Sequence, residues 1–131
     1  MGQQTGFTSI RTAQEVYYAN FLLEGKIVRL DCTDITHIGL DGGLTTIFTR
    51  SQKLRSDYTI AEVVNRLPQE FFVRINRYYI VAPAHVDRVE NYIVVIGRHR
   101  IQANYFYRSK LLEALERVNP KPHIEIKKYI T

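Results

Sequence analysis

The sequence predicts a mainly β fold of the α+β class, in which antiparallel β-sheets carry one short helix and one C-terminal helix. Short segments rich in β-branched and aromatic residues recur along the 131 residues, and turns containing Gly separate many of them. Only two stretches, residues 59–68 and 104–118, place apolar residues at helical spacing. An apolar content of 45% in a chain of this length is enough for one core, so a single domain is expected.

Four extended segments begin the predicted domain. Residues 1–14 are polar and small, and we expect them to form a linker or tail. The expected strands span residues 15–23, 26–31, 35–38 and 44–49. Glu24-Gly25 and Asp41-Gly42-Gly43 have the composition of turns, so consecutive strands should form an antiparallel meander.

The period of the apolar residues changes after Tyr58, which indicates a helix. Thr59 and Glu62 form a capping-box pattern at its start, and Pro68 ends it. The apolar residues of this stretch fall on one helical face: Ile60, Val63, Val64 and Leu67. This short helix should cover one side of the sheet.

Extended segments then resume and lead to the final helix. The expected strands span residues 71–75, 78–81, 85–90, 92–96 and 99–103, with a hairpin turn at Gly97-Arg98. Asn104 is a good N-cap, and Asn119-Pro120 stops the helix. Its apolar face consists of Tyr107, Leu111, Leu115 and Val118. Residues 120–131 are expected to be a C-terminal tail or, through the alternating stretch HIEIKKYI, an edge strand.

The chain carries a formal net charge of +5 and has a pI near 9.4. This imbalance is typical of proteins that bind polyanions, although charge alone separates neither DNA from RNA nor either from a membrane surface. The basic residues recur at turns and strand ends: Arg50, Lys53, Arg55, Arg74, Arg77, Arg98, Arg100, Arg108 and Lys110. Each is equally consistent with a solvated face or with a charge that protects an edge strand.

The sequence lacks the patterns of several other classes of function. Its apolar runs are too short to cross a bilayer and no secretory signal is visible, so a cytoplasmic protein without a membrane partner is expected. The four histidines lack metal-ligand spacing, so no metal ion or other cofactor is expected. No phosphate-binding glycine loop or nucleophile elbow occurs, so we do not expect an enzyme. The single cysteine, Cys32, is expected to be a small strand residue.

Residues 71–82, FFVRINRYYIVA, combine an apolar strand pattern with cationic side chains. A guanidinium is almost never buried unpaired, so Arg74 and Arg77 need a carboxylate, solvent or a phosphate. The segment resembles the signature of the LytTR DNA-binding domain, F-x-R-x-H-R-S-Y-I-V-N. The matching residues are Phe72, Arg74, Arg77, Tyr79, Ile80 and Val81, whereas Asn76, Tyr78 and Ala82 stand where the family usually has His, Ser and Asn.

The resemblance extends from about residue 26 to residue 118. It takes in, in order, the segments KIVRLD, DITHI, TIAEVVNRLP and YFYRSKLLEAL. It implies elongated antiparallel sheets, a LytTR-like domain over residues 15–119, and DNA binding. Such domains commonly follow a receiver or sensor domain, so it also implies the response regulator of a bacterial two-component phosphorelay.

In LytTR domains, loops at one edge of the sheets enter successive major grooves, and the resemblance implies three contact regions here. The first is Leu44 and Thr45, for which a plain hairpin turn is the alternative. The second is Asn76 and Arg77, for which an intramolecular salt bridge is the alternative. The third is the start of the final helix, where an exposed N-terminus also favours a phosphate: Asn104, Tyr105, Phe106 and Arg108.

Tyr105 and Phe106 stand where the family often has basic residues. They lack the positive charge that would bind a phosphate and the paired N–H donors of a guanidinium that match guanine. They either contact thymine methyl groups or sugars, or they are buried as core and leave Arg108 as the nearest cation.

The resulting hypothesis is sequence-specific binding of double-stranded DNA by the effector domain of a bacterial transcription regulator, which pairs on repeated half-sites. The main alternative is a protein-interaction or regulatory module on the same scaffold that has lost operator recognition. A weaker alternative is an RNA or single-strand binder, because nine tyrosines and six phenylalanines can stack on bases.

Overall fold

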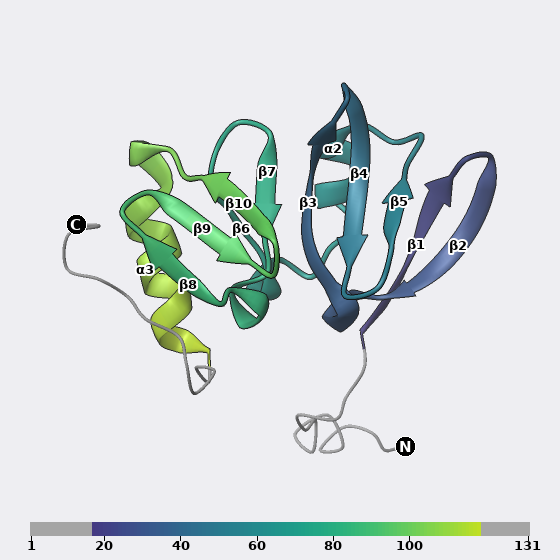
Figure 1. The fold of residues 1–131 in the computed structure, drawn as a ribbon. Coiled ribbons are helices and arrows are strands. Elements are labelled where there is room, and N and C mark those ends of the chain that lie inside the picture. The colour runs from purple at the N-terminus through teal and green to yellow at the C-terminus, as the bar shows by residue number, and fades with distance from the viewer. Residues whose placement is uncertain (1–16, 119–131) are drawn as a thin grey trace, which may run out of the picture.

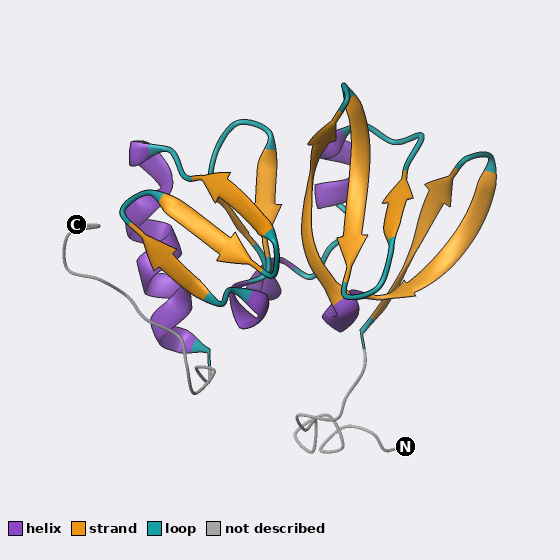
Figure 2. Cartoon of the chain, viewed as in Figure 1, coloured by secondary structure: helices purple, strands orange, loops and turns teal. Residues whose placement is uncertain are grey.

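The computed structural model describes residues 17–118 and consists mainly of antiparallel strands (Figures 1 and 2). The strands are β1 (Tyr18–Leu23), β2 (Lys26–Asp31), β3 (Ile35–Asp41), β4 (Leu44–Thr49), β5 (Lys53–Arg55), β6 (Val73–Arg74), β7 (Tyr79–Val81), β8 (Arg88–Glu90), β9 (Ile93–Ile96) and β10 (His99–Gln102). They form three sheets, ordered β1-β2, β5-β4-β3-β7-β6 and β10-β9-β8. With a short helix, α2 (Ile60–Val64), and a C-terminal helix, α3 (Arg108–Arg117), the predicted fold class is confirmed.

The first hairpins agree closely with the sequence. Gly25 has a φ of 83° between β1 and β2, and Gly42 and Gly43 have φ values of 62° and 80° between β3 and β4. These left-handed conformations favour glycine, which is why the turns could be predicted. β3 continues to Asp41, beyond its expected end at residue 38. The expected linker, the start of the first strand and the expected tail or edge strand lie outside the described residues.

The capping box of α2 is present. The Thr59 hydroxyl accepts a hydrogen bond from the Glu62 amide at 3.1 Å, and the Glu62 carboxylate accepts one from the Thr59 amide at 2.8 Å. The helix ends at Val64, before the expected Leu67, since the Arg66 and Leu67 amides bond carbonyls three residues back and form a tighter turn. Leu67 is buried all the same.

3₁₀ turns shorten two of the expected extended segments. The turn Gln69–Phe71 follows Pro68 and reduces the expected strand 71–75 to Val73–Arg74. The turn Pro83–His85 delays the expected strand 85–90 until Arg88. Proline fixes φ near the value that such turns need.

Cys32 also lies in a 3₁₀ turn, Cys32–Asp34, rather than in a strand. The Asp31 carboxylate caps this turn by accepting a hydrogen bond from the Thr33 amide at 2.9 Å. Burial, with a smaller contribution from Asp31, raises the pKa of Cys32 to about 11. The thiol is therefore protonated at neutral pH and is a poor nucleophile.

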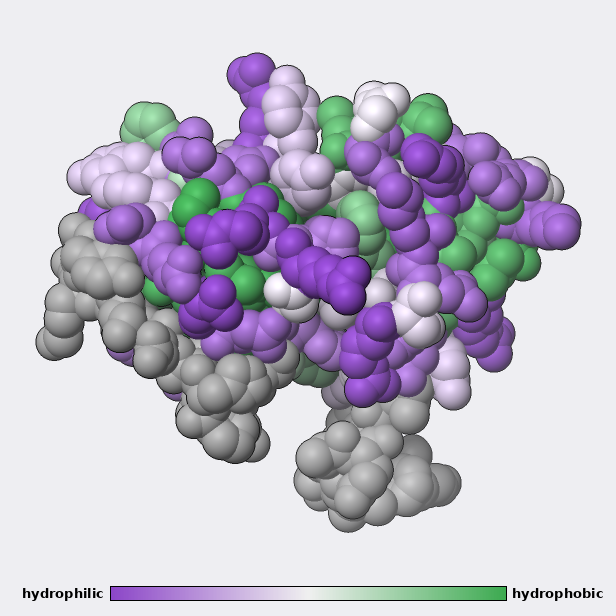
Figure 3. Space-filling view, viewed as in Figure 1, coloured by the Kyte–Doolittle hydropathy of each residue, from purple (hydrophilic) through white to green (hydrophobic). Residues whose placement is uncertain are grey.

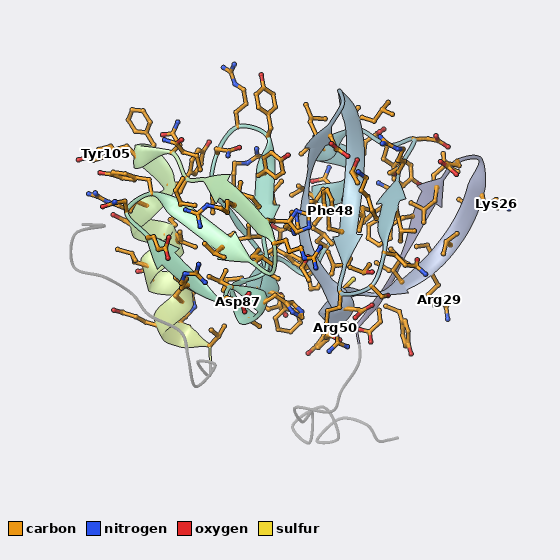
Figure 4. The ribbon with its side chains drawn as sticks, viewed as in Figure 1. Lys26, Arg29, Phe48, Arg50, Asp87 and Tyr105 are labelled. Carbon is orange, nitrogen blue, oxygen red and sulfur yellow. The ribbon has the colours of Figure 1, made fainter. Side chains whose placement is uncertain are left out.

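The core contains two clusters of buried apolar side chains. One gathers residues of β1, β3, β4 and α2, and the other gathers residues of β7, β8, β9, β10 and α3. Between the five-stranded and three-stranded sheets lies a group of rings that we call the inter-sheet layer: His37, Phe48, Tyr79 and His99. The His37 ring stacks on Phe48 at 4.1 Å between centroids and meets the His99 ring edge at 4.6 Å. Figure 4 shows Phe48 between the two halves of the molecule.

Tyr79 occupies the space above Gly39. A Cβ on Gly39 would lie 2.1 Å from the Tyr79 ring, so only glycine fits opposite this tyrosine in the β3–β7 pair. The Tyr79 hydroxyl donates a hydrogen bond to the Leu40 carbonyl at 2.9 Å. Tyr79 thus fixes the strand that follows the loop of residues 75–78.

Candidate nucleic-acid interface

The three regions expected to contact DNA lie along one edge of the molecule. In Figure 1 the turn between β3 and β4, the loop before β7 and the turn before α3 all lie at the top. Figure 3 shows apolar and weakly polar side chains exposed along the same edge. We call this surface the loop edge and define it by Leu44, Arg77, Tyr78, Tyr105, Phe106 and Arg108.

Asn76 holds the second region against the third. Its side-chain amide donates a hydrogen bond to the Gln102 carbonyl at 2.7 Å, and its side-chain oxygen accepts one from the Tyr78 amide at 2.7 Å. The Asn104 amide in turn donates to the Ile75 carbonyl at 2.5 Å. Asn76 therefore positions the neighbouring side chains by bonds within the protein.

Arg77 is exposed beside Asn76. Its guanidinium lies 6.0 Å from the centre of the Tyr78 ring, and no acidic residue among 17–118 lies within salt-bridge distance of it. The backbone of Arg77 is fixed, because Arg74 donates a hydrogen bond to its carbonyl at 2.7 Å. The expected alternative, an intramolecular salt bridge, is absent from the described part of the chain.

Asn104 caps the turn that leads into α3, as expected. Its side-chain oxygen accepts a hydrogen bond from the Phe106 amide at 2.8 Å. This turn leaves Tyr105 66% exposed and Phe106 85% exposed, with the two rings edge to face at 6.1 Å. The alternative that these rings are buried as core is therefore wrong.

Arg108 lies between two tyrosine rings at the start of α3. Its guanidinium donates a hydrogen bond to the Tyr92 hydroxyl at 2.8 Å and lies 5.4 Å from the Tyr92 ring centre and 4.8 Å from that of Tyr105. No acidic residue of the described chain pairs with it. No carboxylate of residues 17–118 therefore compensates its positive charge, and the side chain is held and half-buried.

The first region divides into an accessible and an inaccessible residue. Leu44 is 51% exposed, whereas Thr45 is buried and its carbonyl accepts a hydrogen bond from the Ser56 amide at 2.9 Å. A hydrogen bond from Lys53 lowers the pKa of the nearby Asp41 carboxyl, with a smaller contribution from Arg55. Lys53 Nζ lies 2.6 Å and Arg55 Nη2 3.8 Å from that carboxylate, which reduces its repulsion of a phosphate.

A surface hollow of about 590 Å³ separates the second and third regions. Its lining includes Arg77 and Tyr78 of the second region and Asn104 and Phe106 of the third. Sequence reasoning did not select Tyr78, which is 48% exposed here, or Tyr92, which holds Arg108. The one signal for Tyr78 was its departure from the usual Ser of the motif.

Two absences hold for residues 17–118. No group of three or more His, Cys, Asp or Glu side chains in this part of the chain could hold a metal ion. None of its helices is both long and apolar enough to span a bilayer.

Comparison with known proteins gives concordant matches. The model of the LytTr DNA-binding domain family matches residues 25–120. The sensory transduction protein LytR of Staphylococcus epidermidis is 30% identical over 70 residues, which are 53% of this chain and 28% of that protein. The haem-containing CO-sensing transcriptional regulator RcoM 1 of Paraburkholderia xenovorans is 32% identical over 59 residues, 45% of this chain and 22% of that protein. The chain thus spans less than a third of these relatives.

A solved structure has the same fold. It is the LytTr DNA-binding domain of a putative methyl-accepting/DNA response regulator from Bacillus cereus. The TM-score is 0.62 at 14% sequence identity, and the match covers 75% of this chain and 95% of that one.

Proposed function

We propose that this chain, which belongs to the LytTr DNA-binding domain family, binds double-stranded DNA sequence-specifically through its loop edge, as the effector domain of a bacterial transcription regulator. The family membership agrees with the resemblance drawn from residues 71–82. One observation carries the proposal: Arg77 is exposed at this edge, with a fixed backbone and no carboxylate partner among residues 17–118.

The chemistry of the loop edge fits a duplex groove. The fork of an arginine matches the O6 and N7 acceptors of guanine, so in this proposal Arg77 reads a base. Arg108, held by Tyr92, contributes a fixed positive charge that suits a phosphate. Leu44 provides the contact from the β3–β4 turn, while Asn76 and Asn104 set the backbone and Thr45 lies inside.

The proposal includes the arrangement of the whole regulator. Two domains would pair on repeated half-sites of a duplex, and a receiver or sensor domain would precede each in a cytoplasmic protein. The similar curated proteins are several times longer than the matched segment, which leaves room for such a domain in them. The name of the staphylococcal relative, a sensory transduction protein, agrees with this arrangement.

Selection from a random duplex library tests the proposal, followed by competition against single strands at two salt concentrations. We expect a repeated sequence motif, and affinity that falls with log salt with a slope of about 0.9 per neutralised phosphate. Preference for single strands would favour the RNA or single-strand alternative. Absence of any enriched duplex would contradict the proposal.

A protein-interaction module is the second candidate. Exposed aromatic rings are typical of the centres of protein interfaces, and Tyr105, Phe106 and Tyr78 are all exposed on the loop edge. Moreover, the Asn76 side chain makes two hydrogen bonds within the protein, one to the Gln102 carbonyl and one from the Tyr78 amide. This candidate predicts no enriched duplex in the same selection, so one experiment separates the two.

A further inference from the structure

We infer that Phe106 is a specificity-determining residue that reads a thymine by contact with its C5-methyl group. This inference rests on the proposed function and names what this position recognises. It concerns a residue of this chain where basic residues are common in the family.

The exposure of Phe106 is built into the local structure. The Asn104 cap fixes the Phe106 amide at 2.8 Å, and the bond from the Asn104 amide to the Ile75 carbonyl ties this turn to the neighbouring loop. The ring is 85% exposed, more than any other large apolar side chain of residues 17–118. A fixed backbone with an exposed ring is suited to contact a partner at little cost in conformational entropy.

Its neighbours are less able to make this contact. Arg108 donates to the Tyr92 hydroxyl and lies near the ring faces of Tyr92 and Tyr105, so its fork is engaged. The Tyr105 ring lies against Arg108 on one side and Phe106 on another. Among the ring pairs of residues 17–118, Phe106 pairs only with Tyr105, and it is 85% exposed.

The chemistry of the phenyl ring then limits what it can read. It has no hydrogen-bond donor or acceptor, so it cannot discriminate by the polar groups of the base edges. In the major groove the thymine methyl is the one apolar group among the four bases, and apolar side chains, Phe included, recognise it. Contact with a sugar would add affinity without sequence preference.

The hollow beside Phe106 links its reading to that of Arg77. Both residues line the same hollow of about 590 Å³, Arg77 from the second contact region and Phe106 from the third. They would therefore meet neighbouring parts of one groove. A selected site should contain a thymine close to the guanine contacted by Arg77.

A deoxyuridine scan of the selected duplex tests the inference with the full-length chain. Each thymine is replaced in turn by deoxyuridine, which removes the C5-methyl and preserves base pairing. At one thymine of each half-site the wild-type affinity should fall about four-fold, the effect of one buried methyl group. Phe106→Ala should bind the parent duplex on the order of ten-fold more weakly and should lose its sensitivity at that thymine alone.

Two control variants make the result specific. Phe106→Leu keeps an apolar side chain and should retain sensitivity to the same substitution. Tyr18→Ala removes another exposed ring, 61% exposed on β1, and should behave as wild type throughout. Circular dichroism and thermal melting of each variant check that the fold is unchanged.

The outcomes separate this inference from the proposed function. If a duplex is selected but Phe106→Ala remains as sensitive as wild type at every thymine, thymine reading is overturned and DNA binding stands. Uniform weakening by Phe106→Ala with no methyl dependence would indicate a sugar contact or a wedge, and would overturn it too. If no duplex is selected, the proposed function itself is contradicted.

Discussion

The inter-sheet layer and the loop edge are both rich in aromatic rings and in side chains that can carry positive charge, yet they differ in burial. In the layer, His37 is 1% exposed and lies between Phe48 and His99. On the loop edge, Phe106 is exposed and Arg77 faces solvent.

The same kinds of side chain therefore serve two purposes in this molecule. Burial in the layer, with a smaller contribution from His99, lowers the pKa of His37 to about 3, so this imidazole is neutral. Its ring stacks on Phe48, and its Nδ1 is hydrogen-bonded to the Thr36 hydroxyl at 2.8 Å. On the loop edge the charge of Arg77 stays in water, and the apolar surface of Phe106 remains available. The layer therefore stabilises the fold, whereas the loop edge keeps its interactions for a partner.

Removal of one ring from each region should give the largest difference in stability between the two regions. Phe48→Ala should lower the free energy of unfolding by about 3–5 kcal/mol, because it removes a buried ring that stacks on His37. Phe106→Ala should change it by less than about 0.5 kcal/mol. Urea unfolding of both variants measures the two values, and similar losses would contradict the division.

Acid should weaken the layer before it affects the loop edge. The pKa of His37 is about 3 in the folded chain against an ordinary value of 6.5, so the unfolded state binds the proton more tightly. The contribution of His37 to the free energy of unfolding is largely present above pH 6.5 and is lost as the pH drops towards 3. Between pH 7 and 5 this group should lower the free energy of unfolding by about 2 kcal/mol.

Urea unfolding across this pH range provides the measurement, with His37→Gln as the control. The variant cannot take up the proton, so its stability should vary less between pH 7 and 5 than that of wild type. The other charged or titratable side chains around the layer are Asp41, Lys53, Arg100 and His99. All four are present in both wild type and variant, so the comparison isolates His37. Equal slopes for wild type and variant would show that His37 is not the group responsible.

On the loop edge, loss of charge should affect binding and leave stability intact. Arg77→Ala should cost about 1–3 kcal/mol in affinity for a selected duplex and blur the preference at one base pair. Arg98→Ala is the matched control, since it removes the same charge from the exposed turn between β9 and β10. Equal affinities of wild type and Arg77→Ala would exclude Arg77 as a reading residue.

The smallest effect is expected at Arg108. Its guanidinium donates a hydrogen bond to the Tyr92 hydroxyl. It therefore offers a positive charge, but its N–H donors are not all available to read a base. Arg108→Ala should weaken all duplex sequences alike and reduce the slope of log affinity against log salt by about 0.9, the value for one phosphate. A change in base preference would instead assign reading to Arg108.

Much of the fold was predictable where local chemistry decides the structure. The capping box of Thr59 and Glu62, the Asn104 cap and the Gly25 turn depend on residues adjacent in the chain, and all three are present. Segments 71–75 and 85–90 were predicted too long as strands, because a β-branched and aromatic composition does not show where a strand finds a partner. Proline-led turns interrupt both segments.

The candidate site shows the same limit. Sequence similarity selected Asn76 and Arg77 together, but only the structure separates them into a residue bonded to Gln102 and an exposed cation. Likewise, Leu44 and Thr45 were selected as a pair, and the strand pairing of β3, β4 and β5 exposes one and buries the other.

The sequence by itself determined the family, the turns and caps, and the segments that carry the candidate contacts, because these follow from motifs and from interactions between near neighbours. The tertiary structure decided which rings are buried and which are exposed. His37 becomes neutral because His99, from another sheet, and Phe48 enclose it, and Phe106 is exposed because no distant element within residues 17–118 covers it. Burial depends on contacts between residues far apart in the chain, which no local pattern contains.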